Sequence, residues 1–149
     1  MLTEGLQQVL TVLYPLYKDE VYKRREQMMR LTALGSLGLI AMLFALLLSP
    51  QKHRLSTPEA FLMGIVGLIW CGLFCALVLQ QQYRHRLAKQ VLIRIEQALG
   101  FYEEGLFVEN QALYPDGWKI AWLGDRSGTF YLSVLCLLTL IFLLALLLD

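Results

Sequence analysis

The sequence predicts an all-α membrane protein with three transmembrane helices, and two observations carry this prediction. Of the 149 residues, 57% are hydrophobic and 17% are charged, whereas soluble proteins have about 45–50% and about 25%. Three stretches of 18 to 20 residues contain no Asp, Glu, Lys, Arg or His: Leu31–Leu48, Phe61–Leu79 and Thr129–Leu148. At about 1.5 Å per residue, each helix matches the thickness of a hydrocarbon core. Buried helices of a soluble protein are the alternative, but too little chain remains to cover three of them.

The distribution of Lys and Arg predicts the orientation of these spans. Residues 1–30 carry five of these bases and residues 80–128 carry six, whereas the connector 49–60 carries two. The positive-inside rule therefore places the N-terminus in the cytoplasm and Asp149 outside, in a plasma (inner) membrane. No base precedes Lys18, so no cleavable signal peptide is expected.

Residues 1–30 are expected to form cytoplasmic amphipathic and juxtamembrane helices that are separated at Pro15. Apolar residues before this proline follow helical spacing: Leu2, Leu6, Val9 and Leu13. This first helix either lies in the membrane interface or packs on a partner helix, and its lack of basic residues favours the partner. After the proline, no breaker occurs before Gly35, so one helix is expected over Leu16–Leu48.

The second span is also predicted to extend into the cytoplasm, as a helix over Pro58–Leu99, because no Gly or Pro separates Leu79 from Gly100. The first two spans would then form an antiparallel hairpin with 49–60 as its outer turn. Acids of the first extension could pair with bases of the second: Glu20 and Glu26 with Arg84, Arg86, Lys89 and Arg94. The alternative is that these bases face anionic lipid headgroups. The two interpretations are equally supported for Arg84 and Arg86, whereas pairing is favoured for the other two bases.

Residues 80–128 are expected to combine this cytoplasmic helix with an interfacial loop, and 129–148 to form the third span. Tyr114–Gly117 has the Pro and Gly positions of a type I turn. Aromatic residues recur around it and up to the third span: Tyr114, Trp118, Trp122 and Tyr131. They fit either an interfacial aromatic belt or a small cytoplasmic core under the helical extensions.

Small residues in the spans predict close helix packing. One ridge contains Gly67, Cys71 and Cys75, a second contains Gly72 and Ala76, and a third contains Ala41 and Ala45. Cys71 and Cys75 could also bind a soft ion such as Cu(I). Packing is the favoured role, so no metal site and no cofactor are expected.

The chemistry that is missing excludes several function classes. No catalytic, zinc-binding or phosphate-binding motif occurs, so we expect no catalytic residues and no enzyme. The net charge of +1 gives no electrostatic footprint for nucleic acid. The spans contain no ionisable Asp, Glu, Lys, Arg or His, which argues against a proton-coupled transporter.

A transmembrane hairpin followed by the helical phrase Arg94-Ile95-Glu96-Gln97-Ala98-Leu99-Gly100 resembles small prokaryotic membrane effectors of the SLATT type. This resemblance covers residues 17–100 and implies an oligomer that permeabilises the inner membrane in a defence system. The residues themselves favour a non-enzymatic integral membrane subunit that acts in assembly or scaffolding. Its partners would be the bilayer and either further copies of the chain or another membrane protein.

Overall fold

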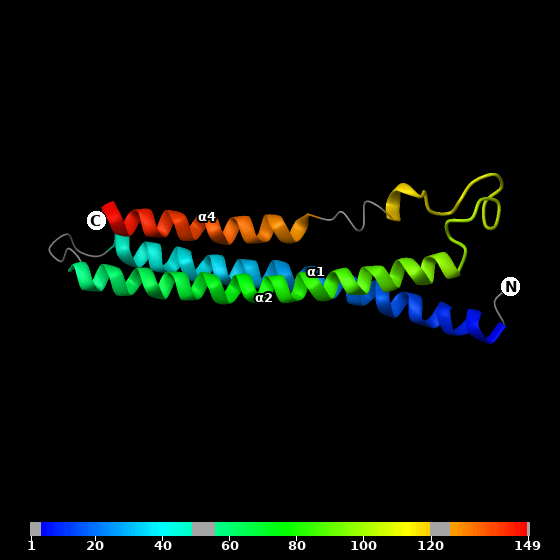
Figure 1. The fold of residues 1–149 in the computed structure, drawn as a ribbon, viewed down its shortest axis with the longest axis horizontal. Helices are drawn as coiled ribbons and strands as arrows, with labels where there is room; N and C mark the ends of the chain where they lie inside the picture. Colours follow the sequence, from blue (N-terminus) through cyan, green and yellow to red (C-terminus); the bar gives the residue numbers. More distant parts are fainter. Residues whose placement is uncertain (1–3, 49–55, 120–125, 149) are drawn as a thin grey trace. The chain divides into compact units, whose positions relative to one another are not determined.

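The structure is a computed structural model that describes residues 4–48, 56–119 and 126–148 (Figure 1). Three long helices occupy most of this chain: α1 (Glu4–Leu47), α2 (Thr57–Ala98) and α4 (Ser127–Leu148). Each is long and apolar enough to cross a membrane. The described residues form no β-strand beyond one isolated bridge between Val108 and Gln111. The predicted all-α membrane class is therefore confirmed.

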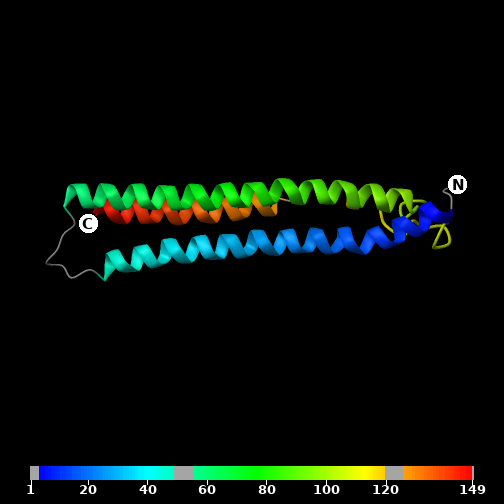
Figure 2. The same ribbon diagram turned by 90° about the horizontal axis from the view of Figure 1, so that it is seen from below.

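The chain divides into two compact units. Unit 1 comprises residues 1–26 and 81–126, and unit 2 comprises residues 27–80 and 127–149. Unit 2 contains α4 together with one part each of α1 and α2, which lie alongside it in Figures 1 and 2. Unit 1 contains the remaining parts of α1 and α2 and the loop that follows α2.

Unit 2 is held together by large side chains that pack onto glycines. Val78, Leu135 and Phe142 are fully buried there. A Cβ atom on Gly67 would lie 2.5 Å from the ring of Phe142, and one on Gly38 would lie 2.5 Å from the ring of Trp70. Close packing of this kind is the main source of helix association in lipid, where burial of apolar surface contributes little.

The predicted helix break at Pro15 is wrong, because α1 continues through this residue. An interior proline removes one backbone hydrogen bond and costs about 3 kcal/mol. Tyr14 and Tyr17 flank the proline, and both pack on the buried cluster of Val21, Ala88 and Leu92 in unit 1. Packing on both sides of the proline holds the helix together at this point.

The second helix agrees closely with its predicted bounds of Pro58–Leu99. At its start, the backbone N–H of Ser56 donates to Glu59 Oε2 over 2.8 Å, one half of a capping box. At its end, Gly100 has a φ of 77°, and the N–H of Phe101 donates to the carbonyl of Glu96 over 3.0 Å. This Schellman ending needs the left-handed conformation that glycine adopts most easily.

The predicted turn at Tyr114–Gly117 lies one residue too early. The N–H of Trp118 donates to the carbonyl of Pro115 over 2.9 Å, so the turn comprises residues 115–118 and leads into a helical turn at 117–119. The N–H of Lys119 likewise donates to the carbonyl of Asp116 over 3.1 Å, so the i to i+3 bonds begin at Pro115, while the N–H of Tyr114 joins it to the end of α2 by donating to the carbonyl of Phe101 over 2.8 Å. The predicted outer turn at 49–60 lies largely outside the described residues, and its last four residues belong to α2.

Candidate functional site

Unit 1 contains a row of buried polar side chains on one face of α2. Gln82, His85, Lys89 and Glu96 are each no more than 9% exposed. Their spacings of three, four and seven residues place them on the same side of a helix. Lys89 was predicted from sequence as an ionic contact, whereas the other three were not singled out as site residues. These residues share helical spacing with the buried Leu92, and this spacing could have identified them from the sequence.

Glu96 is connected to the loop after α2 through a short polar network. The hydroxyl of Tyr102 donates to Glu96 Oε2 over 2.6 Å. The ammonium of Lys119 lies 4.2 Å from the centre of the Tyr102 ring and 2.7 Å from Asp116 Oδ1. Burial raises the pKa of the Tyr102 phenol, and the hydrogen bond and negative charge of Glu96 raise it further. Tyr102 therefore keeps its proton to a higher pH in the folded protein than in the unfolded chain.

This pKa shift predicts that unit 1 loses stability in alkali. Because the folded state binds the phenol proton more tightly, stability is complete below about pH 10, the ordinary tyrosine pKa, and falls as the pH rises above it. Tyr102→Phe should cost about 1.5 kcal/mol at neutral pH through the lost hydrogen bond and should flatten the alkaline decline. Unfolding curves at pH 8 to 11 measure both effects. Tyr22→Phe, at an exposed tyrosine of α1, should change neither, and an equal alkaline decline in all three proteins would contradict the prediction.

Aromatic rings form a cluster in unit 1. Phe101 makes edge-to-face contacts with Tyr14, Tyr114 and Phe107, at centroid distances of 5.4 to 5.6 Å. Tyr114 also stacks on Trp118 at 5.2 Å, and its hydroxyl lies 3.0 Å from that of Tyr14.

Two of the four predicted belt aromatics, Tyr114 and Trp118, thus lie in this cluster, where Trp118 is 47% exposed. Tyr131 packs instead on the buried cluster of Cys71, Val78 and Leu135 in unit 2. Trp122 lies outside the described residues.

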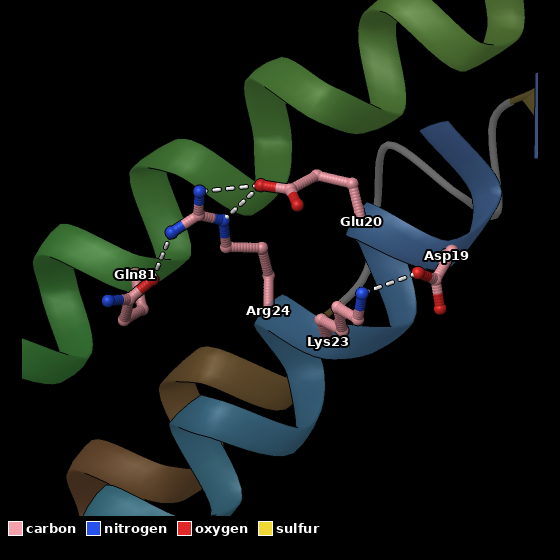
Figure 3. Close-up of polar contacts among 5 residues, drawn as sticks. All are labelled: Asp19, Glu20, Lys23, Arg24 and Gln81. Carbon is pink, nitrogen blue, oxygen red and sulfur yellow. Dashed lines mark hydrogen bonds and ion pairs between the residues drawn. The ribbon is translucent and has the colours of Figure 1, made fainter. Parts of the chain in front are cut away.

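Two pairs of acids and bases in unit 1 lie along α1 (Figure 3). Arg24 donates to Glu20 over 2.7 Å and also to Gln81 Oε1 of α2 over 3.0 Å, while Lys23 lies 2.7 Å from Asp19. Glu20, which was predicted to pair with a base of the second helix, is therefore bonded to Arg24 of its own helix. The contact of Arg24 with α2 is to the uncharged Gln81.

The other predicted ionic residues differ in their surroundings. Glu26 and Lys89 do interact with other groups. Arg84, Arg86 and Arg94 are exposed, and no ion pair among the described residues includes them. This exposure fits the lipid-headgroup alternative.

The predicted small-residue ridges of unit 2 separate into inner and outer positions. Gly67 and Cys71 are buried and Cys75 is half-buried, so this ridge faces the helices of the unit. The other ridges are exposed: Gly72, Ala76, Ala41 and Ala45. A Cβ atom on Gly72 would meet no other atom within 4 Å. Intramolecular packing therefore uses the first ridge and leaves the others open.

Cys136 joins the two predicted cysteines in space. The sulfur atoms of Cys71 and Cys75 on α2 and of Cys136 on α4 all lie within 4.8 Å of one another. Spacing along α2 indicated the first two thiols, but nothing in the sequence indicated which face of the third span meets them.

Comparison with protein families, curated proteins and solved structures finds no match to this chain. The SLATT-type resemblance therefore stays a prediction, and the geometry of the two units is the basis for function.

Proposed function

We propose that this protein is a non-enzymatic integral membrane subunit that assembles through its transmembrane helices. The observation that carries the proposal is the exposed ridge of Gly72 and Ala76 on α2. Adjacent small residues one turn apart let a second helix approach closely in lipid. Because this chain already uses Gly67 for its own packing, the outer ridge is available for another molecule.

The contacts within unit 1 also support this proposal. Its titratable buried groups are tied into structure, as in the bond between Tyr102 and Glu96. The loop after α2 is occupied by ring contacts around Phe101. This arrangement suits a rigid attachment module better than a substrate cleft. The positive-inside pattern supports an inner-membrane orientation in which unit 1 is cytoplasmic and Asp149 lies outside.

Bulky substitutions on the outer ridge test the proposal. Gly72→Leu and Ala76→Leu should lower assembly of the purified protein by at least about tenfold in association constant, because a ridge filled with leucine keeps a second helix away. Cross-linking and native mass spectrometry of the full chain in nanodiscs measure this loss. The matched control is Val66→Phe, at an exposed residue about 100° around α2 from the middle of the ridge, which should leave assembly unchanged. Equal assembly of all variants would refute the role of the ridge.

The pore-forming alternative is separated by dye release from liposomes. An assembly subunit leaves vesicles intact at high protein load, whereas rapid release by the purified chain would favour a permeabilising oligomer. The Leu variants add a second criterion, because a pore built on the outer ridge would lose its activity together with its assembly.

A further inference from the structure

The three cysteines of unit 2 form a compact group of sulfur atoms from two helices. Cys71 Sγ and Cys75 Sγ are 3.8 Å apart, one turn apart along α2. Cys136 comes from α4, and all three sulfur atoms lie within 4.8 Å of one another. Three sulfur ligands at about 2.3 Å from a central ion, the length of a zinc–thiolate bond, lie about 4.0 Å apart in a trigonal plane. The thiols are therefore already close to the spacing of a three-coordinate site.

Packing on either side of the thiols fixes this arrangement. Leu135, next to Cys136, is fully buried, and its carbonyl accepts from the Cys71 thiol over 3.9 Å. Two turns farther along α4, the fully buried ring of Phe142 lies against Gly67. These contacts determine which face of α4 meets α2, so the approach of Cys136 to the other two cysteines follows from the core of the unit.

The donor set selects a soft ion. The group consists of sulfur alone, without a carboxylate or imidazole among the described residues, and thiol ligands favour Cu(I) and Zn(II) over hard cations. Structural zinc sites are almost always tetrahedral with four protein ligands, and this group supplies three. Cu(I) needs fewer ligands, so the donor number favours copper.

The protons of the thiols leave when the ion binds. Each coordinating cysteine loses its proton to water and forms an S–Cu(I) bond as a thiolate, and neither copper nor sulfur changes oxidation state.

We propose that Cys71, Cys75 and Cys136 form a three-thiol binding site for Cu(I) between α2 and α4. Cys71 is buried, Cys75 is half-buried and Cys136 is exposed on the surface of the unit. Bound copper would link the two helices and would make the stability of unit 2 depend on copper. This proposal is independent of the assembly proposed above, which uses the outer ridge of α2.

The test is anaerobic titration of the reduced full-length chain in nanodiscs with Cu(I), against the chromogenic chelator bicinchoninate. We expect one Cu(I) per chain and a sulfur-only, three-coordinate shell in the copper X-ray absorption spectrum. Cys136→Ser removes the exposed ligand without opening the core. It should lower the affinity by at least about tenfold, since even loss of an outer-shell partner typically costs about 10- to 100-fold.

A matched variant tests whether copper binding depends on the arrangement of the three thiols or only on their number. The double variant Cys136→Ser with Leu137→Cys keeps three thiols but moves the third by about 100° around α4, to an exposed position. It should bind as weakly as Cys136→Ser alone. The proposal is overturned if the native chain does not compete with the chelator, or if all three proteins bind Cu(I) equally. Unchanged near-ultraviolet circular dichroism of the variants confirms that helix packing persists.

Discussion

Replacing Gly67 with leucine is expected to destabilise unit 2 by about 3 kcal/mol, near the upper end of the usual cost of overpacking. A Cβ atom at this position would lie 2.5 Å from the fully buried ring of Phe142, and the rest of the leucine side chain would push α4 away from α2. The effect is steric, so it does not depend on whether the surroundings are lipid or detergent. Unfolding in mixed micelles with increasing SDS, followed by near-ultraviolet circular dichroism, measures the loss.

Gly72 provides the matched control, because the same substitution five residues along α2 meets open space. Gly72→Leu should leave the unfolding curve of the dilute, unassembled chain unchanged or slightly improved, since leucine favours a helix by up to about 1 kcal/mol over glycine. The two variants should therefore separate folding from assembly: one weakens the fold, and the other weakens association. If both unfold at the same SDS fraction, the packing described for unit 2 is incorrect.

The fold of this chain could be predicted where local signals agree and failed where a contact between distant segments decided the outcome. The bounds of α2 followed from the absence of breakers up to Gly100, whose left-handed conformation ends the helix. Pro15 has an equally strong local signal for a break. The helix nevertheless continues there, because Tyr14 and Tyr17 pack on a buried cluster that joins Val21 of α1 to Ala88 and Leu92 of α2.

The candidate sites show the same limit. Helical spacing identified the small-residue ridges, but it could not tell the covered ridge of Gly67 from the open ridge of Gly72, because that difference depends on where the ring of Phe142 lies. Spacing also paired Cys71 with Cys75. The third thiol, Cys136, belongs to a leucine-rich span with no marked face, so only the packing of α4 could bring it into the group.

The predicted pairing of Glu20 with the second helix failed for a related reason. Glu20 has a base four residues later on its own helix, and the bond between Glu20 and Arg24 needs no particular register between helices. Pairing with the second helix would have required the two helices to align to within a few ångströms. One contact that crosses between the helices, from Arg24 to Gln81, involves an uncharged residue that a count of charges does not detect.

Phe101→Ala is expected to destabilise unit 1 by about 2–4 kcal/mol. A phenylalanine truncated in a core costs about 3–5 kcal/mol, and Phe101 is half-buried. Its ring contacts Tyr14, Tyr114 and Phe107, and edge-to-face pairs contribute about 0.5–1.5 kcal/mol each beyond their buried area. The ring therefore links the N-terminal helix to the loop after α2.

Phe107→Ala is the matched control for this prediction, because Phe107 lies in the same loop, is 53% exposed and touches the cluster through Phe101. Its loss should cost less than about 1 kcal/mol, the usual scale for a single ring contact. Hydrogen exchange of the full chain distinguishes the two variants. Phe101→Ala should accelerate exchange both in α1 near Tyr14 and in the loop near Tyr114, since the segments lose their common contact, whereas Phe107→Ala should leave both protected. Faster exchange in the loop alone would show that α1 is held by the Val21 cluster and not by the aromatic rings.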